Sequence, residues 1–215
     1  MVFFLSVGVQ GMDRKRSEQP FLFVGNHLCL DFINTQMILR GQRTDLLREW
    51  TDLIAWMIRA KLLSAGEGKE RVSRLDRAEG ERLLNEARAL RTVLREMAER
   101  IVAGKPVPRS TVEAINALLS QCPGYPELIR TNGRFERRFH SEASGVAQLL
   151  VPLAEAASEL LCVADLSLVK KCRNDACILY FYDTTKNHAR QWCSMGLCGN
   201  RIKVAAHYRR KKKGG

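Results

Sequence analysis

The chain has 215 residues, a formal net charge of +12 at pH 7 and a hydrophobic content of 46%. This length is sufficient for one good core and a small second module, and the composition is that of an ordinary globular protein. No stretch reaches the ~18–20 consecutive apolar residues of a membrane-spanning helix, so the sequence excludes an integral membrane protein and predicts no membrane partner.

The positive charge is concentrated at the C-terminal end of the chain. From Ser167 onward there are twelve Lys or Arg residues and only two acidic residues, so this quarter carries +10 of the net charge. Such an asymmetry is typical of an end that binds a polyanion, with nucleic acid ahead of an anionic membrane. A solubilising tail is the alternative interpretation.

Residues 1–20 are expected to form a disordered lead segment. The opening "MVFFLSVGVQ" is apolar, but the positive charges follow it instead of preceding it, which is the wrong order for a secretory signal. We therefore expect a cytoplasmic location. Met12 offers a second start, which leaves open whether residues 1–11 are native.

Residues 21–165 are predicted to form a mainly α-helical domain. Apolar spacing favours a helix from about His27 and an amphipathic helix for which Thr44 is the expected N-cap. Two glycines indicate a loop over Ser64–Lys69, and apolar positions between Leu83 and Ile101 predict a long helix.

The second half of this domain is predicted to contain helices and one small hairpin. Ser110 is the expected N-cap of a short helix, and the Thr-Asn-Gly turn within "ELIRTNGRFERRFH" predicts the hairpin. Another helix follows over residues 146–162, with Pro152 inside it as a cause of a kink. The composition then changes sharply at residues 164–167, where we place the domain boundary.

Seven cysteines are present, and an odd number in a reducing compartment argues against a disulfide framework. Cys29 and Cys162 lie in apolar helical patterns and are expected in the core. The last four cysteines have the spacing C-x4-C-x15-C-x4-C. Four thiolates suit a closed tetrahedral zinc site, which indicates one structural Zn²⁺ ion, with unrelated thiols or a redox switch as the alternative. The predicted metal ligands are Cys172, Cys177, Cys193 and Cys198.

Residues 166–213 are predicted to form a small treble-clef-like zinc finger that ends in a basic helix. Gly199 is expected to let backbone N–H groups approach the ligand sulfur. The predicted order is an extended segment Leu166–Lys171, a turn Cys172–Cys177, a strand Ile178–Tyr182, a return strand Arg190–Cys193 and a last helix that begins at Cys198. The whole chain is thus assigned to the α+β class.

A four-thiolate zinc site has a net charge of −2, which nearby cations would offset while favouring the thiolate form. The flanking cations are Lys171, Arg173, Arg190, Arg201 and Lys203. Helical projection also gives the last helix one basic face for a DNA groove or an RNA backbone. The predicted nucleic-acid contacts are Lys186, Arg190, Lys203, His207, Arg210 and Lys211. Arg201 is either an internal partner of Asp183 or a further contact.

The segment "CRNDACILYFYDTTKNHARQWCSMGLCGNR" resembles the CGNR zinc finger, which is named for its Cys198-Gly199-Asn200-Arg201 run. The segment "LCLDFINT" resembles the start of the ABATE domain, which precedes this finger in the family. The resemblance covers residues 21–213. It implies a bacterial stress-induced transcription regulator whose finger binds DNA and whose helical domain senses an unknown small-molecule effector.

The same resemblance points to Asp31, Asn34 and Thr35 as candidate ligand-binding residues. On a helix, Asp31 lies one turn from Asn34 and shares a face with Thr35. This polar trio is either a ligand-binding patch or a set of buried hydrogen bonds and caps, and we favour the second interpretation.

Two further functions remain open at this stage. An RNA-binding protein could stack bases on the aromatic residues of the finger, and a protein-interaction adaptor could use the finger itself. The sequence has no Ser/His/Asp set, phosphate loop or HExxH motif, so we expect no enzyme activity. It predicts neither the target sequence nor the oligomeric state.

Overall fold

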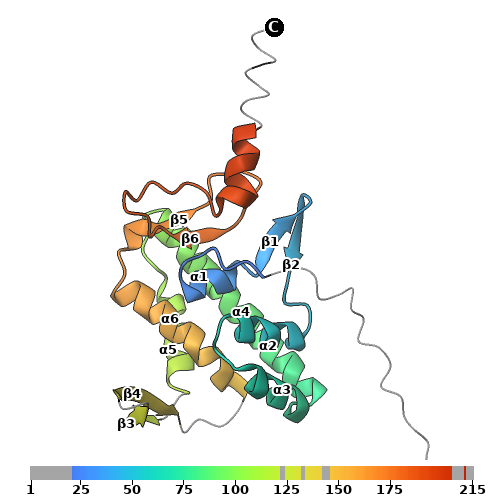
Figure 1. The fold of residues 1–215 in the computed structure, drawn as a ribbon, viewed down its shortest axis with the longest axis vertical. Helices are drawn as coiled ribbons and strands as arrows, with labels where there is room; N and C mark the ends of the chain where they lie inside the picture. Colours follow the sequence, from blue (N-terminus) through green and yellow to red (C-terminus); the bar gives the residue numbers. More distant parts are fainter. Residues whose placement is uncertain (1–20, 122–123, 132–133, 142–145, 205–210, 212–215) are drawn as a thin grey trace, which may run out of the picture.

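The computed structural model describes residues 21–121, 124–131, 134–141, 146–204 and 211. Helices form most of the body, and three two-stranded antiparallel hairpins are attached to it (Figure 1). The helices are α1 (Leu28–Ile33), α2 (Trp50–Arg59), α3 (Ala65–Arg74), α4 (Arg77–Val102), α5 (Arg109–Leu119) and α6 (Val151–Cys162). The strands are β1 (Gln36–Leu39), β2 (Gln42–Asp45), β3 (Gly124–Thr131), β4 (Arg134–Ser141), β5 (Val169–Lys171) and β6 (Tyr180–Tyr182). The predicted α+β class is confirmed.

Helix α4 is the centre of the body, with 26 residues. Its N-terminus is fixed by a capping box in which Asp76 accepts from the Glu79 N–H, and Gly104 lies just beyond its end with φ of +63°. Leu83, Leu90, Leu94 and Met97 are buried along one face. Helices α1, α2 and α5 pack against α4, and α6 packs against α1 and α5.

The chain between residues 36 and 74 differs from the sequence prediction in two places. Thr44 does not cap a helix, because it lies in β2 opposite Met37, and α2 begins at Trp50 with a Glu49–Asp52 capping box. The predicted loop at Ser64–Lys69 is the start of α3. Ser64 and Glu67 form another capping box, which outweighs the helix-weakening effect of two glycines.

Two other local predictions were wrong for geometric reasons. Pro152 does not kink a helix, because it lies in the first turn of α6, where a missing N–H leaves no intrahelical bond unmade. Cys162 is exposed at the end of α6, whereas Cys29 is fully buried as predicted. The β3–β4 hairpin is confirmed, although its turn at residues 132–133 lies outside the described residues.

The C-terminal finger is joined to the helical body through β6. Strand β5 bonds to one edge of β6, as shown by the flanking Cys172 N–H to Leu179 O and Asp183 N–H to Leu168 O bonds. The other edge is covered by the segment around α1. Asn34 exchanges two hydrogen bonds with the Tyr180 backbone, of 2.8 and 3.0 Å, and Tyr182 N–H donates to Gly25 O at 2.7 Å.

This arrangement explains why the predicted return strand does not form. Both edges of β6 already have partners, so residues 190–193 follow an irregular path beside the cluster. The predicted extended segment 166–171 is a short 3-10 turn, Leu166–Leu168, followed by β5. The last helix begins earlier than predicted, with a π-helical turn Met195–Gly199 that contains Cys198, and continues over residues 200–204.

Candidate functional site

The four predicted ligand cysteines meet at one point of the finger. Their Sγ atoms all lie within 4.8 Å of one another, and all four residues are buried. Cys172 follows β5, Cys177 precedes β6, Cys193 follows the long loop, and Cys198 lies in the first turn of the last helix.

The spacing between the sulfur atoms fits a tetrahedral metal ion. The Sγ atoms of Cys193 and Cys198 are 3.6 Å apart, and those of Cys177 and Cys193 are 3.9 Å apart. Tetrahedral thiolates at ~2.3 Å from zinc are roughly 3.8 Å from each other. Four sulfur donors close the coordination shell, so this site fits one structural zinc ion.

The thiols themselves favour a cation at this place. Hydrogen bonds from Cys177 and Cys193 lower the pKa of the Cys172 thiol, whereas the bond with Cys172 raises the pKa of Cys193. One sulfur therefore carries the negative charge more easily than its neighbours, because like charges at this distance oppose a second ionisation. A divalent cation would allow all four thiols to become thiolates, which makes metal affinity dependent on pH.

Asn174 supports the cluster and was not singled out from the sequence. Its side-chain Nδ2 donates to Cys198 Sγ at 3.2 Å, and its Oδ1 accepts from the Ala176 N–H at 3.1 Å. The residue is buried, and its carbonyl accepts from the Cys177 N–H at 2.8 Å. The available sequence signal is an Asn between two ligands, a position that favours a tight turn.

The contacts of Gly199 differ from the predicted ones. A Cβ atom at this position would lie 2.6 Å from Met195 Sδ and 3.1 Å from Trp192 Cδ1, so a larger residue would require these two side chains to shift. The Gly199 N–H donates to Ser194 O at 3.1 Å, as Cys198 N–H does at 3.0 Å, and neither bond reaches a ligand sulfur. The glycine allows the π-helical turn to pack closely against Trp192.

The long loop between the second and third cysteines is organised by Asp183, which is completely buried. Its carboxylate accepts from Lys170 Nζ at 2.7 Å, from Thr185 N–H at 3.0 Å and from Arg190 N–H at 2.9 Å. Burial by itself would raise the pKa of Asp183, but these hydrogen bonds outweigh it and hold the pKa below its usual value. The internal partner of Asp183 is therefore Lys170, and Arg201 is exposed.

Arg190 differs in placement from the predicted nucleic-acid contact. Its guanidinium lies over the Phe181 ring at 4.1 Å and donates to the carbonyls of Val24, Trp192 and Cys193. Burial lowers its pKa, while the nearby Cys193 thiol opposes that shift. These contacts engage the side chain inside the protein, as a counter-charge to the cysteine cluster and a link to the body, so we leave it out of the exposed basic surface.

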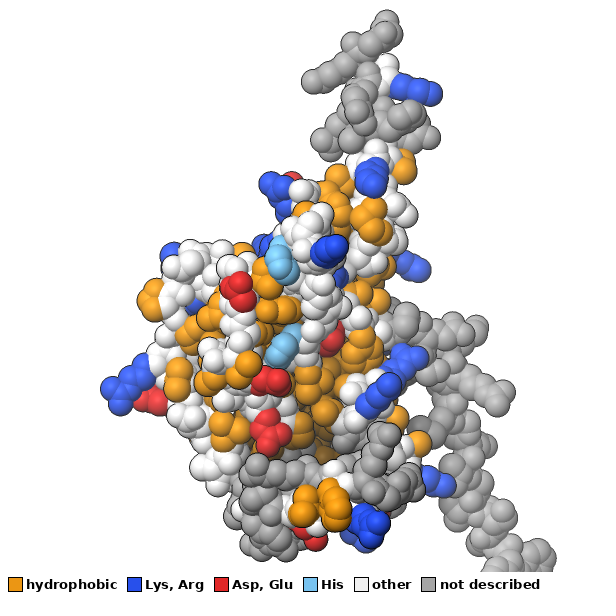
Figure 2. Space-filling view, turned by 60° about the vertical axis from the view of Figure 1, so that its left-hand side comes forward, with side chains coloured by type: hydrophobic (Ala, Val, Ile, Leu, Met, Phe, Trp, Pro, Cys, Tyr) orange, Lys and Arg blue, Asp and Glu red, His pale blue; other side chains and the backbone are white. Residues whose placement is uncertain are grey.

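The remaining predicted nucleic-acid residues are exposed where the structure describes them. Lys186, Lys203 and Lys211 are exposed, whereas His207 and Arg210 lie outside the described residues. Other exposed cations of the finger are Lys171, Arg173 and Arg201. Figure 2 shows Lys and Arg side chains around the finger, while most Asp and Glu side chains on this face lie over the helical body.

The predicted ligand-binding trio is part of the fold instead of a pocket. Asp31 Oδ1 accepts from the Gly25 N–H at 2.7 Å, and Asn34 bonds to Tyr180 as described above. Thr35 Oγ1 donates to Phe32 O at 2.7 Å and accepts from Arg91 Nη1 at 2.8 Å. All three residues are buried with their polar groups bonded, as the structural interpretation of the sequence predicted.

An open cleft of about 610 Å³ lies on the helical body near the same segment. Its polar lining residues are the half-buried His27 and the exposed Glu155 and Glu159. The apolar floor is formed by Leu28, Leu62, Pro152 and Ala156. Burial lowers the pKa of His27, and Glu159 opposes this shift. No single sequence motif indicates this cleft, because its residues come from the start of α1, from α6 and from the turn after α2.

Comparisons with protein families give two matches that together span most of the chain. Residues 26–164 match the ABATE model, described as "Putative stress-induced transcription regulator", and residues 169–211 match the CGNR zinc finger. Comparison with curated proteins gives no significant match. Among the described residues, none of the helices has the length and apolar character needed to cross a membrane.

Proposed function

The chain belongs to the ABATE family and carries a CGNR zinc finger, and on that premise we propose that it is a transcription regulator that binds duplex DNA through this finger. In this proposal the zinc ion is structural and holds the last helix in place, while the cations of the finger contact phosphates. The protein acts by binding instead of catalysis, and its location is the cytoplasm.

One observation carries the proposal: the finger exposes cations around a closed four-cysteine centre. Six described Lys or Arg side chains of the finger are exposed, and Asp175 is the exposed acid among its described residues. The buried acid, Asp183, is already neutralised by Lys170. A rigid scaffold with this charge matches a partner with regularly spaced negative charge, which is the property of a nucleic-acid backbone.

The test is binding of the zinc-loaded protein to a random duplex-DNA library at ~150 mM salt, because electrostatic binding is interpretable only at a stated salt concentration. Cys193→Ser removes one ligand, and Cys162→Ser is the matched control because Cys162 is exposed outside the cluster. We expect an enriched DNA motif for the wild type and the control, and loss of that enrichment for Cys193→Ser.

Other outcomes would redirect the proposal. Preference for structured RNA at equal salt would favour the RNA-binding alternative, although Tyr180 is buried and cannot stack on a base. Weak binding that survives Cys193→Ser would assign the affinity to the basic tail alone and contradict the zinc-organised reader. A finger that binds no nucleic acid would favour a protein-interaction adaptor.

For control by an effector, we propose the cleft at His27 in place of the Asp31, Asn34 and Thr35 trio. The cleft combines an apolar floor with two carboxylates and an imidazole, so it suits a small amphipathic molecule with a positive charge. His27 directly follows Asn26, whose side chain bonds to Tyr182 O and Thr184 Oγ1 of the finger. Thermal-shift screening of small amines, with Glu159→Gln as the variant that should lose the shift, tests this site.

A further inference from the structure

We propose that the β1–β2 hairpin is a second arm of the DNA-binding surface, with Arg40 and Arg43 at its tip contacting phosphates beside the last helix of the finger. This inference rests on the proposed DNA-binding function. It adds to that function a contact surface from the helical body, which the sequence assigned only to structure and ligand sensing.

The hairpin packs on the finger instead of on the helical core. Met37 of β1 is buried in the small core that contains the four cysteines, and Leu39 packs against the same core. Leu197, from the first turn of the last helix, also packs there. The hairpin and the start of the last helix therefore contribute to the same small core, and in Figure 1 the hairpin tip points toward the end of the molecule where that helix begins.

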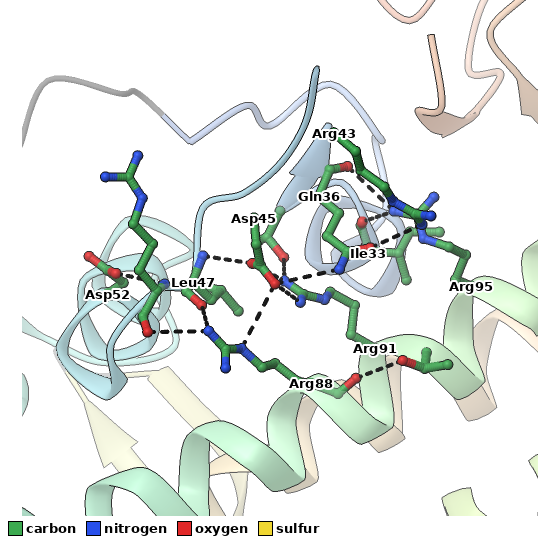
Figure 3. Close-up of polar contacts among 12 residues, drawn as sticks. Ile33, Gln36, Arg43, Asp45, Leu47, Asp52, Arg88, Arg91 and Arg95 are labelled. Atoms are coloured by element: carbon green, nitrogen blue, oxygen red, sulfur yellow. Dashed lines mark hydrogen bonds and ion pairs between the residues drawn. The ribbon is translucent and has the colours of Figure 1, made fainter. Parts of the chain in front are cut away.

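Two arginines of α4 form hydrogen bonds and an ion pair with residues of the hairpin (Figure 3). Arg91 is buried, forms an ion pair with Asp45 at the end of β2 and donates to Thr35 Oγ1 at 2.8 Å. Arg95 donates to Gln36 O at the start of β1, at 3.4 Å, and to Ile178 O of the finger, at 3.1 Å. One side chain thus bonds to both the hairpin and the finger, so the two are held as one unit.

The tip has a backbone conformation that does not favour arginine. Arg40 and Gly41 have φ values of +50° and +81°, the combination of a two-residue type I′ turn. Gly, Asn and Asp are preferred at both positions of this turn, because other side chains crowd the backbone at positive φ. Asn at position 40 would suit the fold better than Arg.

The side chains of the tip are open to solvent. Residues 40–43 are all exposed. Within the described part of the chain, the Arg40 guanidinium makes no hydrogen bond or ion pair, and Arg43 donates only to Gln36 Oε1, at 3.2 Å. The body thus exposes two cations on a hairpin whose residues Met37 and Leu39 pack at the core of the finger, and the finger itself exposes Arg201 and Lys203.

Duplex DNA fits this geometry best. A major groove ~12 Å wide admits a helix, and the phosphates along its edge lie at fixed positions. A hairpin fixed beside the helix can meet that edge without rearrangement, whereas a flexible single strand offers no fixed spacing. In this arrangement the last helix enters the groove and the hairpin tip bonds to the backbone that borders it.

The experiment compares Arg40→Asn with Lys61→Asn in the full-length, zinc-loaded protein. Lys61 is also an exposed cation at positive φ, +62°, but it lies at the C-terminal end of α2 in the helical body. Both substitutions remove one charge and place Asn in the same backbone region. Affinity for duplex DNA is measured by fluorescence anisotropy at several salt concentrations, and the thermal midpoint is measured for each protein.

We expect Arg40→Asn to lower DNA affinity by about 10-fold, as for loss of one charge-assisted hydrogen bond, without lowering the thermal midpoint. The magnitude of the salt slope should fall by about 1, and Arg43→Gln in the same background should lower it further. Lys61→Asn should change the affinity less than 2-fold, because single exposed charges at a distance are screened.

Three other outcomes would overturn the inference, and each would show whether the hairpin contact alone or DNA binding itself is wrong. Equal effects of Arg40→Asn and Lys61→Asn would show that only net charge matters, so the hairpin makes no contact while DNA binding itself stands. A difference seen only on structured RNA would overturn the assignment to duplex DNA. A wild-type protein that binds no nucleic acid would remove the proposed function and this surface with it.

Discussion

The two cores of this molecule differ in the side chains that form them. The larger core, around α4, contains bulky apolar side chains such as Trp56, Phe32 and Leu94, and needs no metal to exclude water. The smaller core contains four cysteines together with Leu179 and Phe181. Each core also includes side chains from the other region: Val169 and Tyr180 of the finger are in the larger one, and Met37 and Leu46 of the body are in the smaller one. The finger is therefore not an appended module, and its stability depends on both a metal and the body.

The largest expected effect comes from breaking the metal site. Structural zinc contributes on the order of 10 kcal/mol to the folding of small fingers, and the apolar part of the smaller core is too small to replace it. We expect Cys193→Ser, or a strong chelator, to unfold the finger while most far-ultraviolet circular dichroism of α2–α6 remains. Metal content and limited proteolysis would measure this directly.

The control for this prediction is a cysteine that lies outside the metal site. Cys162→Ser should retain one zinc ion per chain and the wild-type thermal midpoint, because Cys162 is exposed outside the cluster. Complete loss of helical signal in Cys193→Ser would mean that the larger core does not stand without the finger, and the contrast between the two cores would be wrong.

A smaller effect is expected at the joint between the two regions. Asn34→Ala leaves the Tyr180 N–H and C=O without their partners, both in a buried environment. An unsatisfied buried polar group costs about 1–3 kcal/mol, so we expect a loss of roughly 2–3 kcal/mol in urea unfolding. Asn116→Ala, at an exposed position on α5, should cost less than about 0.5 kcal/mol.

The same variant tests how rigidly the finger is held. Hydrogen exchange of the β6 amides should become faster in Asn34→Ala than in Asn116→Ala, because the outer edge of β6 loses its cover. A change in stability without faster exchange at β6 would mean that Asn34 supports only α1, and that the joint depends on other contacts.

The smallest effect concerns pH. Burial raises the pKa of Asp31 to about 6, while the Gly25 N–H and Arg190 oppose the shift. In the unfolded chain an aspartate has a pKa of about 3.9, so the folded state binds the proton more tightly. This group therefore adds stability as the pH falls from about 7 to about 4 and removes it as the pH rises.

Asp31→Asn should abolish this contribution, since the amide keeps the Oδ1 acceptor but has no proton to gain. The free energy of unfolding of the variant minus that of the wild type should be about 1 kcal/mol larger at pH 7.5 than at pH 5. The lowered pKa values of His27 and Asp45 act in both proteins and cancel in the difference. A difference that is independent of pH would show that Asp31 is ionised throughout this range.

Sequence reasoning was most successful where chemistry or length left few alternatives. The cysteine spacing predicted the metal cluster, because four thiols in two matched pairs suit a tetrahedral zinc site better than they suit separate roles. The 26-residue α4 was readily predicted, since its apolar period is repeated over many turns. The β3–β4 hairpin was also predicted, from its Thr-Asn-Gly turn.

The errors have a common physical cause, which is that short elements carry little periodicity. Strands β1 and β2 have four residues each, too few to show a recognisable alternation, and the end of β2 overlaps the start of the predicted helix at Thr44. The Arg40-Gly41 pair was the available hairpin signal, and the Ser64–Glu67 capping box was the available signal for α3. Both signals come from residues that favour a tight turn or a helix start. They indicate the observed structure where the spacing of hydrophobic residues does not.

The sequence by itself determined the metal ligands, the basic end and the main helices, because these depend on residue types at fixed separations along the chain. Only the tertiary structure decided which cations face solvent and which are buried. Arg190 is half-buried and bonded to Val24, whereas Arg40 is exposed, and the chain positions of these residues contain no sign of that difference. Contacts between segments more than a hundred residues apart, such as that of Asn34 with Tyr180, determine which side chains face solvent. These contacts exist only after the two cores have packed together.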